Sequence, residues 1–400
     1  MTGRAYIATF AVLALIGFAL IAALGLAVDA YGVFGTRLIP ASHFPPQLRL
    51  VKRWDRVTKA IEIAERRGDQ ILFIGDSRSQ RGLDPDSPSL SGAKAYNAAL
   101  VGATLAEQIV ALDWSLAHDT GVKHVVWGVS FETFPFGIFP LSDYSQSAFA
   151  GNSIASGLMR HLFAYDYVVS SWRALKQARK LVRTTMKRNG VVIYGSEPVE
   201  GAELVQFFES ELKSTSRNVS GPLEQDAVNK ALAELTQRLV KLKAAGIDVD
   251  LVVLPVHMWR LIFYRAIGIE DQTDEWKRRL AAMVEEIAAA PGSGKLRFFD
   301  FERPHPFVEQ PVLTSPPPGE RRNYLESSHF YTWLGDKVLA KIFGKAQDPE
   351  IEEEPFGREI GRGAGMTPVD DDVASAKAAL DRWEAAHQDE VSHVRKLILK

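Results

Sequence analysis

The chain of 400 residues contains no cysteine. This absence excludes disulfide bonds, thiolate metal sites and cysteine nucleophiles. The sequence also lacks a Walker phosphate loop, a dinucleotide-binding fingerprint, internal repeats and histidine pairs at metal-ligand spacing. We therefore expect neither a metal ion nor another cofactor.

A strong excess of one charge is missing as well. The chain carries 47 Lys and Arg residues against 49 Asp and Glu residues, which gives a net charge of −2. Such a chain exerts no general attraction on nucleic acid, and we expect no nucleic-acid partner. Its length is nevertheless sufficient to bury a large core.

Charged residues are absent from 5–28, which is almost wholly apolar. As a helix rising ~1.5 Å per residue, this segment would be about 36 Å long, enough to cross a ~30 Å hydrocarbon core. A cleaved signal peptide has a shorter apolar region and a small-residue cleavage site, which only Val28-Asp29-Ala30 resembles here. The sequence therefore predicts an uncleaved transmembrane anchor over 1–28.

One short stretch combines a strand with a candidate nucleophile. The four apolar residues of 71–74 are typical of a buried strand in a parallel sheet. Gly75 permits a sharp turn, which places Asp76 and Ser77 just past the carboxyl end of the strand. Ligands bind at this edge of an open α/β sheet. Ser77 is therefore a candidate nucleophile, provided that a base can reach it.

A candidate base lies near the other end of the chain. Glu326 and His329 are three residues apart, so one helical turn would place them on the same side. Ser77 would then be the nucleophile, His329 the general base and Glu326 the carboxylate that orients the imidazole. Two alternatives stay open. His257 also follows a strand and could be the base or a substrate ligand, and Asp300 could replace Glu326 as the acid.

The combination resembles the SGNH, or GDSL-like, hydrolases, which are esterases and acyltransferases with a flavodoxin-like sandwich. In that family the nucleophile lies in a Gly-Asp-Ser block after the first strand, and the last block is Asp-x-x-His. Ser77 and His329 match these blocks, whereas Glu326 stands where the family has Asp. The resemblance covers about residues 70–345.

The two middle blocks of the family match less well. Its second block is a Gly after the second strand, and Gly102 is the match, which implies that the N–H groups of Ser77 and Gly102 stabilise the oxyanion. An ordinary turn is the alternative for Gly102. Asn97 could also donate to the oxyanion, or it could be a turn asparagine. The third block, Gly-x-Asn-Asp, has no match; Glu132 follows the third strand instead and is a candidate second carboxylate.

The residues that flank the nucleophile are also candidates for the site. We place Asp76 and Arg78 among its oxyanion and substrate residues. Arg78 or Arg81 could bind an anionic group of the substrate, and the alternative is that an arginine ties down the loop through hydrogen bonds to carbonyl groups.

Apolar runs alternate with helical patterns along most of the chain. They predict strands near 71, 94, 124, 249 and 296, and hence an α/β fold in which a parallel five-stranded, flavodoxin-like sheet forms a three-layer α/β/α sandwich. We expect the anchor at 1–28, a linker and leading helix at 29–69, the SGNH hydrolase-like domain at 70–345 with an insertion at about 141–225, and a flexible acidic segment and C-terminal helix at 346–400.

The missing third block makes the chain more similar to the membrane-anchored branch that acylates cell-surface polymers, such as the alginate O-acetylation and D-alanyl transfer proteins. The resemblance implies a serine esterase or O-acyltransferase, with acetyl as the expected group, acting on an exported polysaccharide or lipid-linked glycan. It also implies a membrane-bound partner that donates the acyl group. The alternative is a non-catalytic envelope protein of the same fold that binds a polysaccharide or an assembly partner.

The orientation of the globular part is a separate question. Arg4 precedes the apolar segment. The four basic residues that come soonest after it are Arg37, Arg49, Lys52 and Arg53, and this excess opposes a simple positive-inside count. The later charges are interspersed in a folded domain, and the resemblance to polymer-modifying proteins implies an external domain. We therefore expect a single-pass protein of the cytoplasmic membrane whose globular domain faces the periplasm or cell exterior. A domain that faces the cytoplasm is the alternative.

Overall fold

The computed structural model describes residues 3–36, 38, 49–50, 55–134, 143–177, 184–194, 198–219, 224–314, 320–345 and 355–398. The chain divides into two compact units. Unit 1 comprises Met1–Glu65, Pro140–Arg188 and Val192–Gly195, and unit 2 comprises Arg66–Phe139, Asn189–Val191 and Ser196–Lys400.

Unit 1 is built on the N-terminal helix α1 (Gly3–Val28), which is long and apolar enough to cross a membrane. Only its C-terminal end is buried, against α5 (Ile154–Phe163) and α6 (Tyr165–Gln177). Helix α2 (Asp55–Glu65) completes this small core. The unit also contains 3-10 turns η3 (Tyr144–Gln146) and η4 (Ala148–Ala150) and an antiparallel sheet of β1 (Arg49–Leu50), β5 (Thr184–Met186) and β6 (Val192–Tyr194).

The segment expected to be one insertion at 141–225 is divided between the two units. Residues 140–188 belong with α1, because the apolar faces of α5 and α6 are buried against the end of that helix. Helix α7 (Gly201–Asn218), from the second half of the segment, belongs to unit 2. Most of the linker expected before α2 lies outside the described residues.

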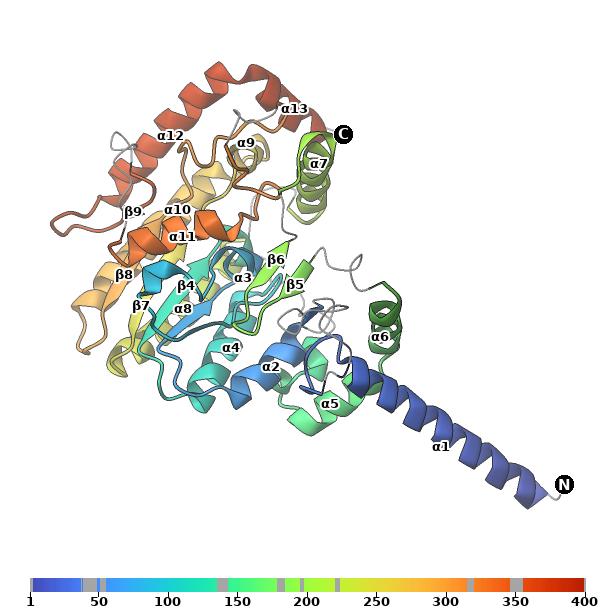
Figure 1. The fold of residues 1–400 in the computed structure, drawn as a ribbon. Coiled ribbons are helices and arrows are strands. Elements are labelled where there is room, and N and C mark those ends of the chain that lie inside the picture. The colour runs from blue at the N-terminus through green and yellow to red at the C-terminus, as the bar shows by residue number, and fades with distance from the viewer. Residues whose placement is uncertain are drawn as a thin grey trace. The chain divides into compact units, whose positions relative to one another are not determined.

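Unit 2 contains a mostly parallel six-stranded sheet with the order β3-β2-β4-β7-β8-β9. Figure 1 labels β4, β7, β8 and β9 of this sheet. Its strands are β2 (Ile71–Ile74), β3 (Ala95–Asn97), β4 (His124–Val129), β7 (Asp248–Val253), β8 (Leu296–Asp300) and β9 (Arg358–Glu359). The first five in this order are parallel and are the five that the sequence predicted. Numbered along the chain, these five have the order 2-1-3-4-5 of flavodoxin-like folds.

The sixth strand corrects the prediction of five. Strand β9 is antiparallel to β8, and the N–H of Ile360 donates to Phe298 O at 2.8 Å. The ring of Phe356 packs on Phe301, with 5.2 Å between centroids. Part of the C-terminal segment expected to be flexible is therefore held on the sheet edge, whereas 346–354 lie outside the described residues. The single expected C-terminal helix is two, α12 (Val369–Ala386) and α13 (Gln388–Ile398).

Helices flank the sheet in two rows. One row is formed by α4 (Leu105–His118), α8 (Gln225–Ala244) and α10 (Glu270–Ala289), in which α8 contacts both α4 and α10. In the other row, α3 (Ser77–Gly82) packs on α11 (Thr332–Ile342). Helix α9 (Met258–Ala266) follows β7 and packs on α13, which also contacts α7. 3-10 turns η1 (Pro88–Leu90) and η2 (Phe131–Thr133) complete the unit. The connections after β2 and β4 meet where the strand order reverses, which is the usual place for a ligand in such sheets.

Candidate active site

The turn between β2 and α3 places Ser77. Gly75 has φ +148°, and a Cβ at this position would lie 2.2 Å from Ser79 Oγ and 2.7 Å from Gly128 O. Only glycine fits so close to the end of β4. The chain therefore passes directly from the buried strand into α3, whose first residue is Ser77.

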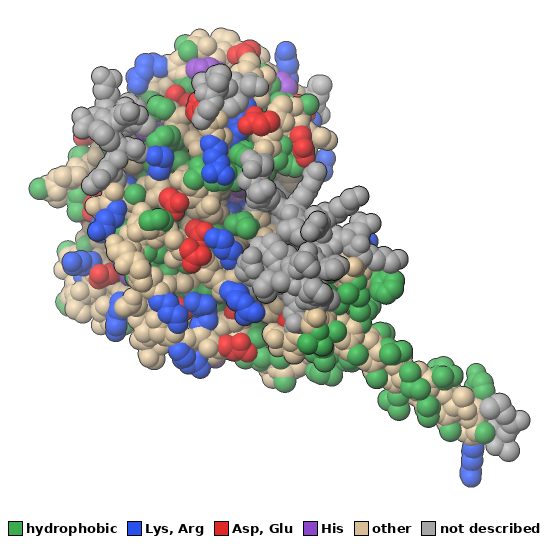
Figure 2. Space-filling model, viewed as in Figure 1, with side chains coloured by type: hydrophobic (Ala, Val, Ile, Leu, Met, Phe, Trp, Pro, Cys, Tyr) green, Lys and Arg blue, Asp and Glu red, His purple; other side chains and the backbone are tan. Residues whose placement is uncertain are grey.

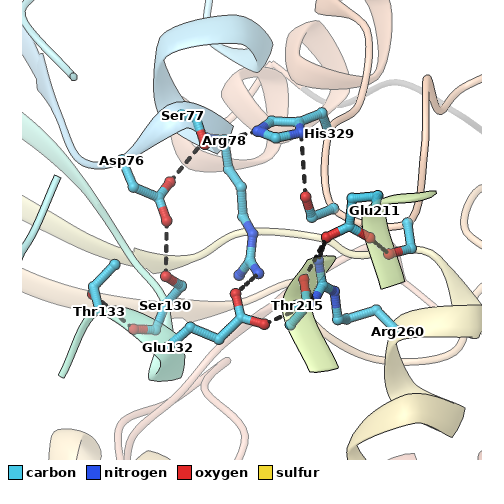
Figure 3. Close-up of polar contacts among 12 residues, drawn as sticks. Asp76, Ser77, Arg78, Ser130, Glu132, Thr133, Glu211, Thr215, Arg260 and His329 are labelled. Atoms are coloured by element: carbon cyan, nitrogen blue, oxygen red, sulfur yellow. Dashed lines mark hydrogen bonds and ion pairs between the residues drawn. The ribbon is translucent and has the colours of Figure 1, made fainter. Parts of the chain in front are cut away.

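Asp76 is the N-cap of α3. Its carboxylate accepts hydrogen bonds from Arg78 N at 2.8 Å and from Ser130 Oγ at 2.8 Å (Figure 3). The first bond satisfies a free N–H of the first turn of α3, and the second connects this turn to the residue that follows β4. The structure thus gives Asp76 a capping role in place of the expected contact with substrate or oxyanion.

Ser77, His329 and Glu326 lie in one line of contacts. His329 Nε2 is 2.7 Å from Ser77 Oγ (Figure 3). The other ring nitrogen, Nδ1, is hydrogen-bonded to Glu326 Oε1. The Glu326 carboxylate also accepts a hydrogen bond from Ser328 N at 2.9 Å. The three residues predicted to act together are therefore adjacent, in the order nucleophile, base and acid.

The turn that carries Glu326 and His329 is not helical, contrary to our expectation. Tyr324 and Phe330 form an antiparallel β-bridge, and Leu325 N donates to His329 O at 2.9 Å. The turn closed by these contacts brings the two side chains to the same side as effectively as a helical turn would.

Burial and neighbouring charges set the protonation of the pair. Burial lowers the pKa of His329 and Arg81 lowers it further, while Glu326 opposes both. Burial alone would raise the pKa of Glu326, but His329, the Ser328 N–H and Arg260 together hold this pKa well below its usual range. At neutral pH the imidazole is therefore neutral, as a general base requires, and the carboxylate is ionised.

Two backbone N–H groups remain candidates for the oxyanion. Ser77 is the first residue of α3, where an N–H has no partner within the helix. The loop that leads to Gly102 lies against the turn that carries Ser77, because Leu100 N donates a hydrogen bond to Gly75 O at 3.1 Å. Gly102 has φ +57°, a left-handed conformation that glycine adopts without strain.

Asn97 does not have the predicted oxyanion role. Its Nδ2 donates to Ser79 O at 2.8 Å and to Leu83 O at 2.8 Å, while Oδ1 accepts from Ala99 N at 3.1 Å. The side chain is fully buried and binds the last carbonyl groups of the short helix α3. Asn97 therefore holds the helix that carries Ser77 in place.

His257 and Asp300 also have structural partners. His257 Nε2 donates to Gln310 O at 2.7 Å, and Nδ1 accepts from Trp259 N at 3.2 Å, which caps α9. Burial lowers the pKa of His257 to about 4. Asp300 pairs with Lys277 at 2.8 Å. Both ring nitrogens of the rival base are thus occupied, and the rival acid pairs with a lysine.

A buried chain of charges extends from the residue after the nucleophile (Figure 3). Arg78 Nη2 is 2.5 Å from Glu132 Oε2, and Glu132 Oε1 is 2.9 Å from Arg260 Nη1. Arg260 pairs in turn with Glu211 of α7, which accepts a hydrogen bond from Ser327 Oγ. Arg78 is only 2% exposed and binds Glu132, so it neither faces a substrate nor ties down the loop through carbonyl groups.

Sequence reasoning missed the far half of this charge network. Arg260 and Glu211 lie inside helices, where a charged residue usually marks a solvated face. Burial raises the pKa of Glu211 to about 7, with Arg260 opposing and Glu326 adding to the shift. Because Ser327 lies between Glu326 and His329 along the chain, the network contacts the turn that carries the candidate base.

Comparisons with known proteins add little to this site. No protein-family model and no curated protein matches the chain. One solved structure, described as that of a "putative platelet activating factor from Streptococcus pneumonia", is similar over 72% of this chain and 90% of its own, with 11% sequence identity and a TM-score of 0.31. So distant a likeness carries no argument, and the function has to be inferred from the geometry of the site.

Proposed function

We propose that the protein is a serine-dependent esterase or O-acyltransferase. The observation that carries the proposal is the 2.7 Å contact between Ser77 Oγ and His329 Nε2, with an ionised Glu326 on the other ring nitrogen. In this arrangement His329 takes the Ser77 proton as the oxygen attacks an ester carbonyl. Glu326 then stabilises the imidazolium ion that forms.

The rest of the reaction follows from the same groups. The N–H groups of Ser77 and Gly102 stabilise the oxyanion of the tetrahedral intermediate. His329 returns its proton to the leaving alcohol oxygen, which leaves the acyl group on Ser77. Water or a sugar hydroxyl then attacks this acyl-enzyme with His329 as the base. Hydrolysis and acyl transfer use the same catalytic residues and differ only in whether water or a sugar hydroxyl accepts the acyl group.

Helix α1 is a retained membrane anchor in this proposal. Tyr167 Oη donates to Gly25 O at 3.1 Å, and a Cβ at Gly25 would lie 2.7 Å from Leu162 Cδ1. The sole candidate cleavage site, 28–30, is buried in unit 1, with at most 1% of each residue exposed. Removing α1 would therefore expose part of the core of that unit, which favours an anchor over a cleaved signal.

An anchored enzyme of this kind would act on a substrate held at the membrane. We propose that the globular part faces the periplasm or cell exterior and that the acceptor is an exported polysaccharide or a lipid-linked glycan. Acetyl is the acyl group we propose, supplied by a membrane-bound partner protein.

The test uses the full-length chain in detergent with p-nitrophenyl acetate as the acyl donor. We expect release of nitrophenol and an acetyl group on the peptide that contains Ser77. Ser77→Ala and His329→Ala should lose both signals. Ser79→Ala is the matched control, because Ser79 lies in the same helix with a buried hydroxyl, and it should keep them.

Transfer is then tested by adding mannuronate oligosaccharides and measuring acetylated product against released acetate. A wild-type chain that never acquires acetyl, yet retains these oligosaccharides, would contradict catalysis and favour a binding protein.

A further inference from the structure

Helices α5 and α6 carry large apolar side chains on their outer surface. The exposed fractions are 57% for Met159, 37% for Phe163, 80% for Tyr165, 52% for Trp172 and 40% for Leu175. The opposite faces of the two helices are buried against the end of α1. A surface of this composition usually marks an interaction site.

This surface continues the exposed apolar surface of α1. Side chains of α1 are 50–68% exposed at Ile16, Phe18, Leu20 and other apolar positions. Figure 2 shows apolar side chains along the helix and at its base. The Phe18 and Phe163 rings are in edge contact, with 5.7 Å between centroids. The turn between α5 and α6 therefore lies beside the apolar part of α1, not beyond its end.

The depth of this turn follows from the length of α1. Arg4 has to stay at the polar edge of the bilayer, and a ~30 Å hydrocarbon core takes about 20 residues of helix. The opposite edge of the core then falls near Leu24. Phe18 is six residues before Leu24, or about 9 Å inside the hydrocarbon. Phe163, which contacts Phe18, lies at a similar depth.

We propose that the α5–α6 turn is inserted into the outer leaflet of the bilayer beside α1. Phe163 lies in the hydrocarbon, and the more polar rings of Tyr165 and Trp172 lie at the interface, where such residues are enriched. The exposed Arg160 and Arg173 are long enough to reach lipid phosphates. The inference rests on the proposed anchoring by α1 and adds a second membrane contact.

Lipid fits this surface better than a partner protein does. The surface is continuous with a helix whose own exposed face is almost wholly apolar from Ala5 onward. A shallow insertion of about 5–10 Å is the usual depth of interfacial helices. The combination of aromatic and basic side chains is also that of an interfacial segment.

The absence of cysteine in the natural chain makes a direct test simple. Single-cysteine variants Phe163→Cys and Tyr165→Cys are labelled with an environment-sensitive fluorophore. The full-length proteins are placed in liposomes of phosphatidylcholine and phosphatidylglycerol that contain nitroxide-labelled lipid. Leu13→Cys in α1 reports the anchor, and Ala155→Cys, exposed at the other end of α5, is the matched control.

We expect the probes at 163 and 165 to be quenched several-fold more than the probe at 155. Equal quenching at these three positions, with equal reactivity toward a water-soluble thiol reagent, would overturn the proposal. Protection of 163 and 165 in native membranes but not in liposomes would also overturn it, in favour of a protein partner.

The probe at 13 separates this inference from the proposed function. Quenching at 13 without quenching at 163 would refute the insertion of the turn and leave the anchor intact. No quenching at 13 would refute both. Acetylation of Ser77, measured in the same liposomes, reports the catalytic proposal independently of either outcome.

Discussion

Asn97→Ala should destabilise the fold and leave the chemistry of the folded enzyme nearly intact. The buried side chain donates hydrogen bonds to Ser79 O and Leu83 O and accepts one from Ala99 N. After truncation Ser79 O keeps a hydrogen bond from Leu83 N at 3.2 Å, whereas Leu83 O and Ala99 N lose this partner. A buried polar group that loses its partner costs about 1–3 kcal/mol, so we expect a loss of about 3 kcal/mol in the free energy of unfolding.

Two measurements on the full-length chain in detergent separate this role from the alternative. Urea unfolding gives the stability, and p-nitrophenyl acetate hydrolysis, measured where the variant is still folded, gives kcat. We expect a lower urea midpoint and a kcat within about tenfold of wild type. Loss of an oxyanion donor would instead lower kcat by about 10²–10³-fold. That result, with an unchanged midpoint, would refute the structural role of Asn97.

Three further changes test other parts of the site. Gly75→Ala places a Cβ 2.7 Å from Gly128 O and should lower stability, measured by thermal melts, by at least about 2 kcal/mol. Gly92 is also at positive φ but lies in open space, so Gly92→Ala should lower stability less. Equal losses of stability in the two variants would contradict the packing argument. Glu326→Gln should lower kcat/KM by about 10⁴-fold. Since Glu326 raises the pKa of His329, the acid limb of the remaining activity should move to lower pH, and a limb that moves upward would contradict the assignment. Glu211, with a pKa of about 7 against an ordinary 4.5, binds its proton more tightly in the folded state, so wild type should lose stability as pH rises through this interval. Glu211→Gln should gain stability relative to wild type over the same interval in urea titrations, and a difference independent of pH would contradict the shift.

The sequence was sufficient for the parallel part of the sheet. Each of its five strands is an apolar segment followed by a turn or a helical pattern, and that alternation defines an α/β fold. Strand β9 was missed because it has two residues and is held by backbone hydrogen bonds, which leave no hydrophobic pattern. The division into two units was missed because the faces of α5 and α6 that contact α1 have the helical periodicity of any buried face.

At the candidate site, motif and spacing were enough to bring together Ser77, His329 and Glu326. They were not enough for Asn97 and His257. A polar residue at the end of a strand has the same appearance in the sequence whether it caps a helix or meets a substrate. Its hydrogen bonds decide between the two, and these involve carbonyl and N–H groups that a sequence pattern does not specify.

Labelling of Ser77 by a fluorophosphonate tests the central claim most directly, since this probe reacts with serine hydroxyls that a neighbouring base activates. The full-length chain in detergent is treated with the probe, together with Ser77→Ala, His329→Ala and the control Ser79→Ala. We predict labelling of wild type and of Ser79→Ala on the peptide that contains Ser77, and none in the other two variants. An unlabelled wild type, or equal labelling of Ser77→Ala, would contradict the assignment of Ser77 as a nucleophile activated by His329.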